Sequence, residues 1–423
     1  MISSKTKRRI GYWLFLILFT LVACEILLRI FNPFPSSVVG DKIILTPNYS
    51  KIYKNTTGAA DMDETIIYKR NSIGLRGPEP PVAFKDHLSI IAIGGSTTEC
   101  MFISEGKTWE DQLYKNLSGS FPKLWVNNGG FAGHSSFGHI ILLRDYIINL
   151  KPTICLFLVG GNDIDRKDLN PHDENFTKTN DKWILSLAKK SALANTLLNL
   201  YRNHLAKEKS LADGKPFSLL NKKPFVIPDF VIQEKIRLQE PLVKAFASRL
   251  KEMIRLCKLN GIEPIFITQP CLAGESIDSV TGVDLASFPM SDKINGKLFW
   301  KYMQLYNAET IKVSKEEGLC CIDLANELPK SSAYYYDLIH YNISGNARVA
   351  KILSEKLDPY LHTKYPGFYR NIFIKSGHYQ EKYPMSSKAI QNLGCREFFH
   401  CSAPLRAFVE TLHTGTLRKP QKY

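Results

Sequence analysis

The run Leu88-Ser-Ile-Ile-Ala-Ile93 decides the fold, because it is apolar almost throughout and stops at the turn Gly94-Gly95-Ser96-Thr97. A short run without polar alternation predicts a strand that is buried on both faces, as in a parallel sheet. Four later runs have the same character and complete a predicted set of five strands, at 124–127, 153–159, 262–268 and 319–322.

Helix-length stretches lie between these runs and after the last one, and they predict an alternation of strands and helices. The predicted helices are 108–117, 137–150, 232–259, 295–317 and 344–357. Alternation of this kind predicts an α/β fold, a doubly wound five-stranded parallel sheet of the flavodoxin type flanked by helices. Right-handed crossovers then bring the carboxyl ends of all five strands to one edge, where sites form.

The rest of the chain divides around this domain, for which we set bounds of 87–361. Before it come an apolar amino terminus (1–31) and a polar, turn-rich segment (32–86) that we interpret as an irregular linker. After it comes a basic tail (362–423), to which we assign no fold. A long insertion, 165–229, carries an amphipathic stretch at 183–205. It is interpreted either as a cap over the site or as a surface elaboration without a catalytic role.

The amino terminus predicts a membrane helix. Its first ten residues carry a charge of +4, and the apolar run that starts at Gly11 extends past Cys24 to Phe31, which is long enough to span a bilayer. Glu25 and Arg29 share a helix face and can pair near the membrane boundary. The basic side should stay in the cytoplasm, so the rest of the chain is expected outside it.

Three interpretations of this segment remain open, and each of them exports the body of the protein. We favour an uncleaved single-pass anchor, because the apolar character continues past Glu25. The sequence Leu21-Val-Ala-Cys24 also resembles a bacterial lipobox, which would make Cys24 a lipidated first residue. A cleavable signal peptide is the third interpretation.

Composition excludes several other classes of protein. The chain has 423 residues and a net charge of +15, of which the first ten residues hold +4 and the stretch after Leu361 holds +7. The folded middle is therefore only mildly basic, which argues against nucleic-acid binding. The nine cysteines form no Cys-x-x-Cys pair, so a zinc site is not expected. Cys395 and Cys401 could pair if the tail is outside the cytoplasm.

Four short motifs follow predicted strands, and each alone has an ordinary structural explanation. They are Gly94-Gly95-Ser96-Thr97, Asn128-Gly-Gly-Phe-Ala-Gly133, Gly160-Gly-Asn162-Asp163 and Asp337-Leu-Ile-His340. The first three are explained equally well by tight turns or helix caps, and the fourth by a helix-entry turn. Together they place a hydroxyl, a free backbone N–H, an amide and a carboxylate–imidazole pair at one edge of the sheet.

On these motifs the sequence resembles the SGNH/GDSL hydrolase family over about 88–357. Ser96, Gly133, Asn162 and His340 match its four blocks, with Asp337 as the third member of a catalytic triad. One position departs from the family's frequent Gly-Asp-Ser, because Gly95 stands where that Asp would be. The segment Asn71-x-x-Gly74-x-Arg76-Gly77 also resembles membrane-anchored bacterial members of the family.

The resemblance implies an activity and roles for these residues. Ser96 would attack an ester or thioester carbonyl, His340 would take its proton and Asp337 would orient the ring. The N–H groups of Ser96 and Gly133 and the amide of Asn162 would form the oxyanion hole. No cofactor or metal is expected.

The expected function is an exported esterase or acyl-transfer enzyme acting on O-acyl groups, above all acetyl, of a surface glycan. The alternatives are a lysophospholipase or thioesterase, or a catalytically silent binding or assembly protein. The expected partners are an acylated small molecule, lipid or glycan and the membrane, and no nucleic acid. His134 and His139 are weaker candidates for a direct role, and we expect Tyr334, Tyr335 and Tyr336 to pack the pocket wall.

Overall fold

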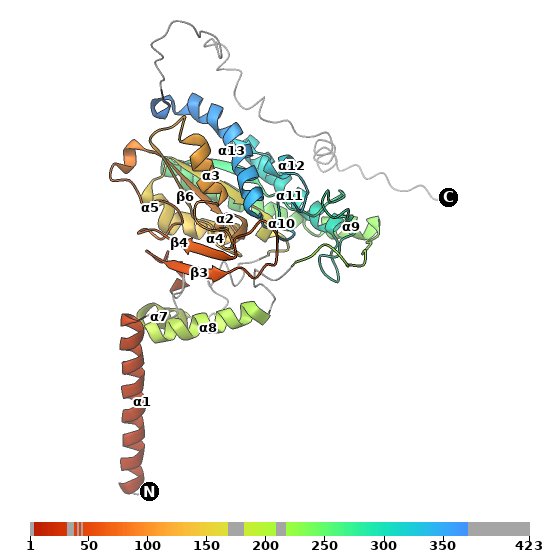
Figure 1. Cartoon of the computed structure of the whole chain (residues 1–423). Helices are drawn as coiled ribbons and strands as arrows, with labels where there is room; N and C mark the ends of the chain where they lie inside the picture. The colour runs from red at the N-terminus through yellow and green to blue at the C-terminus, as the bar shows by residue number, and fades with distance from the viewer. Residues whose placement is uncertain are drawn as a thin grey trace, which may run out of the picture.

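The computed structural model describes residues 4–31, 38–39, 42–43, 45–167, 182–208 and 217–370. Figure 1 shows a helix-flanked sheet domain at one end of a long amino-terminal helix. Cys395 and Cys401, whose pairing the sequence leaves open, and the rest of the tail from residue 371 onward lie outside the described residues.

The central sheet has five parallel strands in the order β6-β5-β7-β8-β9. This order is that of a flavodoxin-like doubly wound sheet, in which the chain starts near the middle and switches direction once. The fold predicted from the sequence is therefore confirmed. The strands are β5 (Leu88–Gly94), β6 (Leu124–Asn128), β7 (Ile154–Val159), β8 (Glu263–Thr268) and β9 (Cys321–Ile322).

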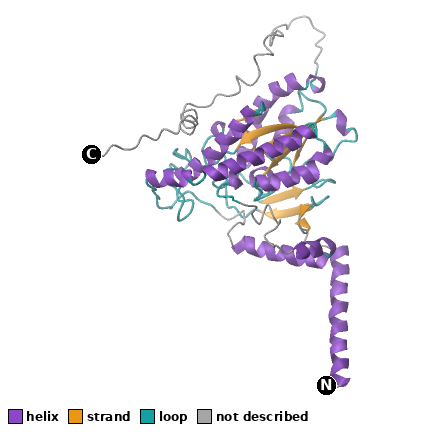
Figure 2. Cartoon of the chain, turned by 180° about the vertical axis from the view of Figure 1, so that it is seen from behind, coloured by secondary structure: helices purple, strands orange, loops and turns teal. Residues whose placement is uncertain are grey.

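Both faces of this sheet are covered by helices, as Figure 2 shows from behind. Alternate residues of β5 enter two separate apolar clusters, with Ile91 and Ile93 in one and Ile90 and Ala92 in the other. The pleat of the strand sends these side chains to opposite faces. One cluster is closed mainly by α4 (Ser136–Leu142), α10 (Glu240–Leu259) and α11 (Gly296–Glu316), and the other by α3 (Trp109–Leu117) and α13 (Ile343–Lys364).

Two predicted helices are interrupted. The stretch predicted as 137–150 consists of α4, the π-helical turn η2 (Leu143–Ile147) and α5 (Ile148–Leu150). The stretch predicted as 232–259 splits into α9 (Asp229–Arg237) and α10. Pro241 lies in the first turn of α10, and its missing N–H suits a helix start rather than a helix interior.

The segment before the domain is more ordered than its composition indicates. β3 (Ser50–Lys54) pairs antiparallel with β4 (Thr65–Lys69), and Arg76 forms an isolated bridge with Asn128 at the end of β6. Arg76 and Asn71 are buried. The expectation of an irregular linker over 32–86 is thus wrong for much of its length, because these polar residues bond to the domain rather than to water.

The amino-terminal helix α1 (Ser4–Ile30) is long and apolar enough to cross a membrane, although a signal sequence would pass the same test. α7 (Lys182–Lys190) and α8 (Ala192–Glu208), from the long insertion, lie beside its carboxyl end. The remaining described elements are short: β1 (Val38–Val39), β2 (Lys42–Ile43), η1 (Phe84–Asp86), α2 (Ser96–Glu99), η3 (Gly161–Asp163), α12 (Leu324–Glu327) and η4 (Pro366–Phe368).

Candidate active site

Ser96 lies at the carboxyl edge of the sheet, as the first residue of the single helical turn α2 that follows β5. The turn is tight enough to need glycine. A Cβ on Gly94 would lie 2.1 Å from Thr98 Oγ1 and 2.7 Å from the carbonyl oxygen of Leu158. Ser96 is partly exposed while Thr97 and Thr98 are buried, so the turn presents the serine alone.

Asp337 and His340 lie in the loop between α12 and α13, and the two side chains face each other. Asp337 Oδ1 accepts hydrogen bonds from the backbone N–H groups of Ile339 at 2.8 Å and His340 at 2.7 Å. Asp337 Oδ2 lies 2.6 Å from His340 Nδ1. On the other side of the ring, His340 Nε2 lies 2.7 Å from Ser96 Oγ.

These distances fix the direction of the hydrogen bonds. An ionised carboxylate can only accept, so His340 Nδ1 carries a proton and donates it to Asp337. In the neutral ring Nε2 then has a lone pair, which accepts from the Ser96 hydroxyl. The structure thus joins Ser96, His340 and Asp337 into one hydrogen-bonded chain, in which the base next to the hydroxyl is held in the tautomer that can take its proton.

Opposing effects determine the pKa of Asp337. Burial raises the pKa, but the positive charge that His340 can carry, the hydrogen bond from its ring and the two backbone N–H donors together outweigh that effect. The pKa of Asp337 is therefore held below 3.8, and the group is a carboxylate at neutral pH. The ring of Tyr336 stacks on the imidazole of His340, with 5.4 Å between the ring centroids and 8° between the ring planes.

Gly133 and Asn162 line the same cavity as Ser96 and His340, and its volume is about 250 Å³. Gly133 ends the loop after β6 with a φ of +74°, a conformation that favours glycine. Asn162 lies in η3, directly after β7, and its Nδ2 donates to the carbonyl oxygen of His134 at 2.9 Å. The structure thus brings together all five residues that the sequence motifs single out.

Residue 95 is a glycine at a position where the Asn162 side chain lies close to the backbone. A Cβ on Gly95 would lie 2.5 Å from Asn162 Nδ2 and 3.4 Å from the carbonyl oxygen of His134. The Asn162 amide therefore occupies space next to the serine turn that any larger residue at 95 would need. The hydrogen bonds around this turn accordingly differ from those that a Gly-Asp-Ser block could make.

The weaker histidine candidates also line this cavity. His134 and His139 are both buried, and their ring centroids are 6.3 Å apart. Burial lowers the pKa of His139 to about 3, so its ring is neutral at ordinary pH. Tyr335 and Tyr336 are buried and Tyr334 is half-buried, but none of the three is among the residues that line the cavity.

Glu99 is a residue beside the candidate site that the sequence reasoning missed. It ends the turn that starts at Ser96, and its Oε2 accepts from the backbone N–H of Ala132 at 2.7 Å, next to Gly133. Its Oε1 accepts from Tyr68 Oη at 2.9 Å and from Arg70 Nη2 at 3.2 Å. The amino-terminal segment thereby ties the serine turn to the Gly133 loop. The sequence shows a carboxylate three residues after the serine, but only the fold shows that it bonds to the N–H of Ala132, Tyr68 and Arg70.

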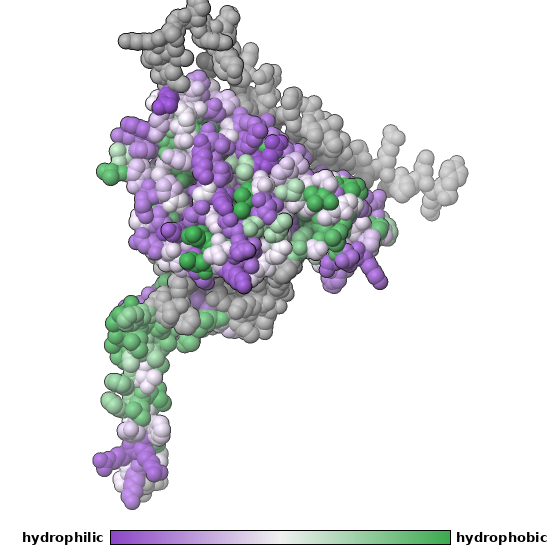
Figure 3. All heavy atoms as spheres, viewed as in Figure 1, coloured by the Kyte–Doolittle hydropathy of each residue, from purple (hydrophilic) through white to green (hydrophobic). Residues whose placement is uncertain are grey.

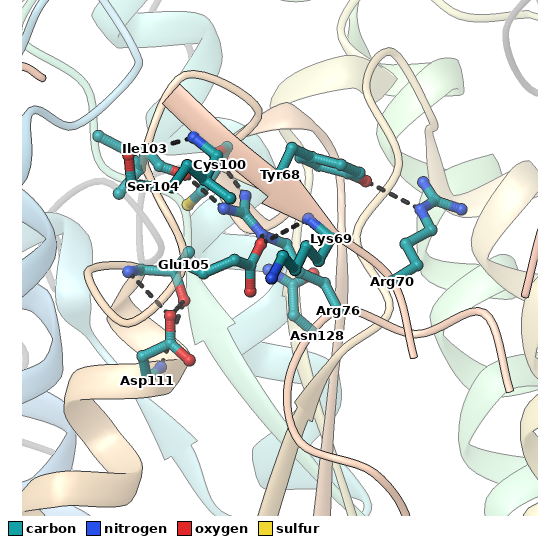
Figure 4. A network of polar contacts seen from close by, with 12 residues as sticks. Tyr68, Lys69, Arg70, Arg76, Cys100, Ile103, Ser104, Glu105, Asp111 and Asn128 are labelled. Carbon is teal, nitrogen blue, oxygen red and sulfur yellow. Dashed lines mark hydrogen bonds and ion pairs between the residues drawn. The ribbon is translucent and has the colours of Figure 1, made fainter. Parts of the chain in front are cut away.

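Arg76, in the segment that resembles membrane-anchored family members, contacts the chain that follows the same turn. Its Nη1 donates to the carbonyl oxygens of Glu99 at 2.7 Å and Cys100 at 2.6 Å, and its Nη2 to that of Ile103. Its Nε donates to Glu105 at 2.7 Å. Figure 4 shows the guanidinium turned into this loop, between Cys100 and Glu105. Arg76 therefore holds in place the backbone that follows the serine turn.

A second buried ion network lies behind Asn162. Asp163 is fully buried and accepts from the backbone N–H of Ser136 at 3.1 Å and from Arg249 Nη2 at 3.1 Å, as well as from the Ser136 hydroxyl. The guanidinium of Arg249 packs 4.0 Å from the centre of the Phe137 ring. In the sequence, Arg249 stands out only as a charged residue on the apolar face of a predicted helix. The described residues contain no cluster of His, Cys, Asp and Glu suited to a metal ion.

Comparison with known proteins gives three results. The family model described as GDSL-like lipase/acylhydrolase matches residues 92–348, which contain all five residues that the motifs single out. Among solved structures, an acetylxylan esterase from Geobacillus stearothermophilus is 14% identical, covers 63% of this chain and 93% of its own, and has a TM-score of 0.37. A GDSL-like lipase from Bacteroides thetaiotaomicron is 12% identical, with coverages of 68% and 93% and a TM-score of 0.35. No curated protein sequence matches the chain.

Proposed function

This chain belongs to the GDSL-like lipase/acylhydrolase family, and from that premise we propose that it is an exported serine esterase. We propose that it removes or transfers short O-acyl groups, above all acetyl, on a surface glycan. The observation that carries this proposal is the hydrogen-bonded chain from Ser96 through His340 to Asp337. Family membership supports action on ester bonds. The nature of the acyl group and of its acceptor is the proposal's own addition.

The proposed first half of the reaction acylates the serine. Ser96 Oγ attacks the ester carbonyl carbon while its proton passes to His340 Nε2, 2.7 Å away. The ring is then positively charged, and the carboxylate of Asp337 at 2.6 Å stabilises it. The tetrahedral intermediate collapses, the C–O bond of the ester breaks, and His340 returns the proton to the departing alcohol oxygen.

The intermediate's negative oxygen needs donors, and three groups of the cavity can supply them. They are the backbone N–H groups of Ser96 and Gly133 and the second amide hydrogen of Asn162, whose first is bound to His134. Each such donor is typically worth about 3 kcal/mol of the barrier. In the second half of the reaction water, or a sugar hydroxyl, gives a proton to His340 and attacks the carbonyl carbon of the acyl-serine. The bond from that carbon to Ser96 Oγ then breaks, His340 returns the proton to Ser96 Oγ, and the acid or a new ester leaves.

The cavity supports a short acyl group on a polar alcohol. Its volume of about 250 Å³ is below the range of about 300–1,000 Å³ that is usual for drug-sized ligands, and a long acyl chain would need more room. Arg166 lines it beside the site residues, and its guanidinium suits the hydroxyls of a sugar. Gln269 also lines it, but its amide is bonded to Thr97, Pro270 and Tyr341. A lysophospholipase would instead need a long apolar channel.

A substrate panel tests this function. Purified full-length protein in detergent should cleave acetate esters faster than butyrate esters, and octanoate and palmitate esters slowly. It should also release acetate from an O-acetylated polysaccharide, with Ser96→Ala as the inactive control. A preference for palmitate or for lysophospholipid would favour the lipase alternative, and no cleavage of any ester would contradict the esterase proposal.

We also propose that α1 is an uncleaved anchor with the catalytic domain on the exported side. The helix continues without a break through Cys24 to Ile30, and its amino-terminal end is basic. A reporter fused at the chain's end should be active only in the exported compartment. Mass spectrometry should find the intact amino terminus. An acylated Cys24 at the terminus would replace the anchor with a lipid, and a reporter active in the cytoplasm would contradict export.

A further inference from the structure

The two insertion helices α7 and α8, which we call the platform helices, are fixed to the carboxyl end of α1. Glu25 of α1 accepts from Ser191 Oγ at 2.7 Å, Ala192 N at 2.9 Å and Leu193 N at 3.0 Å. These N–H groups belong to the first turn of α8, which would otherwise lack acceptors. Arg29 adds a bond from its Nη2 to the carbonyl oxygen of Lys190 at 2.6 Å. The platform helices are thus attached to α1 by polar contacts with Glu25 and Arg29, one helical turn apart near its carboxyl end.

That level coincides with the expected edge of a bilayer. At about 1.5 Å per residue the stretch from Ile10 to Ile30 is about 30 Å long, which equals the thickness of a hydrocarbon core. Glu25 would then lie about 7 Å inside its outer end, with its charge satisfied by Arg29 and by the start of α8. In Figures 1 and 2 the platform helices run crosswise to α1 at this end, between α1 and the catalytic domain.

The platform helices expose large apolar side chains at helical spacing. On α7 Trp183 is 65% exposed and Leu187 is 48% exposed, four residues apart. On α8 Leu197 is 59% and Tyr201 60% exposed, also four residues apart, with Leu200 at 43% between them. Residues at this spacing lie on one face of a helix. Each helix therefore has an apolar face that nothing in the described part of the protein covers.

The composition of this face fits a lipid surface. Trp and Tyr are enriched at the boundary between lipid and water, where an apolar ring with a polar tip is stable. Lys189 and Lys190 are exposed where α7 ends, and their long basic side chains can reach lipid phosphates there. Figure 3 shows that the apolar surface of α1 continues onto the helix pair at its upper end.

We propose that α7 and α8 lie in the interface of the membrane that α1 crosses, with Trp183, Leu187, Leu197 and Tyr201 at the boundary between headgroups and acyl chains. The occupant of the apolar face is the bilayer, because the face is continuous with a helix that spans it. The inference rests on the proposed anchoring by α1. Part of the insertion then acts as a second membrane-contacting element, fixed to the carboxyl end of α1.

Tryptophan quenching by lipids brominated near the headgroup tests this arrangement in full-length protein reconstituted into vesicles. Trp109, Trp125 and Trp300 are buried in the catalytic domain and give a constant background. In Trp183→Phe the remaining lipid-accessible reporter is Trp13 of α1, which is 62% exposed. In Trp13→Phe the reporter is Trp183.

Both single variants should be quenched, and the double variant should lose most of the lipid-dependent quenching. If the variant that keeps Trp13 is quenched but the variant that keeps Trp183 is not, α1 is an anchor and the platform proposal is wrong. If neither is quenched, the anchor itself is wrong, and the platform fails with it. The two failures are therefore distinguishable.

A matched control places a tryptophan on an exposed site away from α1. Phe230 on α9 is 75% exposed, and α9 lies on the far side of the domain from α1 in Figure 1. Phe230→Trp, made in the double variant, should show no lipid-dependent quenching. Quenching equal to that of Trp183 would mean that any exposed aromatic residue reports lipid, which would overturn the platform proposal.

Discussion

The two halves of the candidate active site are built in different ways. Asp337 and His340 lie three residues apart, and their mutual contacts lie within one loop. Gly133 and Asn162 instead depend on distant segments, because Glu99 holds the residue before Gly133 and Asp163 follows Asn162 into a buried network with Arg249. The half that moves a proton is therefore locally encoded. The half that would stabilise charge is positioned by tertiary contacts.

Removal of the base should have the largest effect. His340→Ala leaves Ser96 without a proton acceptor, so kcat on the best acetate ester should fall by about 10⁴–10⁶. The double variant with Ser96→Ala should be little worse than either single variant, because the residues act as one unit. The His340→Ala and Ser96→Ala variants should unfold thermally within a few degrees of the wild type. A normal thermal midpoint shows that the loss of activity does not come from a loss of folding. Additive losses would show that the two residues act independently.

Loss of the buried ion pair should be the next largest effect, and it should fall on stability. Arg249→Met removes the guanidinium that pairs with the buried Asp163 carboxylate, and should lower the free energy of unfolding by about 3 kcal/mol. The double variant with Asp163→Asn should recover part of that loss. Urea unfolding measures both values.

Arg255→Met is the matched control for this prediction. Arg255 lies in the same helix, but its pair with Glu252 is on the surface, with 56% of the arginine side chain exposed. Little change in stability is expected there, because exposed pairs contribute little. Equal effects of the two substitutions would mean that the network behind Asn162 is not a special support.

Asn162→Ala should cost about 10²–10³ in kcat, since it removes one of three proposed oxyanion donors. The Michaelis constant should change little, because the lost interaction forms only in the transition state. Steady-state kinetics on an activated acetate ester separates the two quantities. A rise in the Michaelis constant with unchanged kcat would place Asn162 in substrate binding and would leave the oxyanion role to the backbone N–H groups.

The smallest predicted effect is a pH dependence from His139. Its folded-state pKa of about 3 lies below the ordinary 6.5, so between these values the unfolded chain binds more protons than the folded one. Stability should therefore fall as the pH drops below 6.5, by up to about 1.4 kcal/mol per unit. His139→Phe should flatten this part of the profile, as measured by urea unfolding from pH 7 to about pH 5. An unchanged slope would contradict a buried, neutral ring.

Local patterns in the sequence were enough to predict the sheet and to single out the five residues that the structure brings together. Apolar runs marked the strands, and Ser96, Gly133, Asn162, Asp337 and His340 stand in short motifs at strand ends or at a helix entry. Glu99, Arg70 and Arg249 could not be assigned in this way, because their roles depend on partners that are distant in sequence. The linker was misjudged for the same reason, since Arg76 looks like a surface residue until its carbonyl acceptors are known.

The measurement that most directly tests the central claim is active-site labelling by a fluorophosphonate, which reacts with a serine only when a neighbouring base activates it. Peptide mass spectrometry should find the adduct on Ser96 in the wild type. Ser96→Ala should not be labelled, and His340→Ala should be labelled far more slowly. An adduct on another serine, or wild-type ester cleavage by Ser96→Ala, would contradict the assignment of Ser96 as the nucleophile.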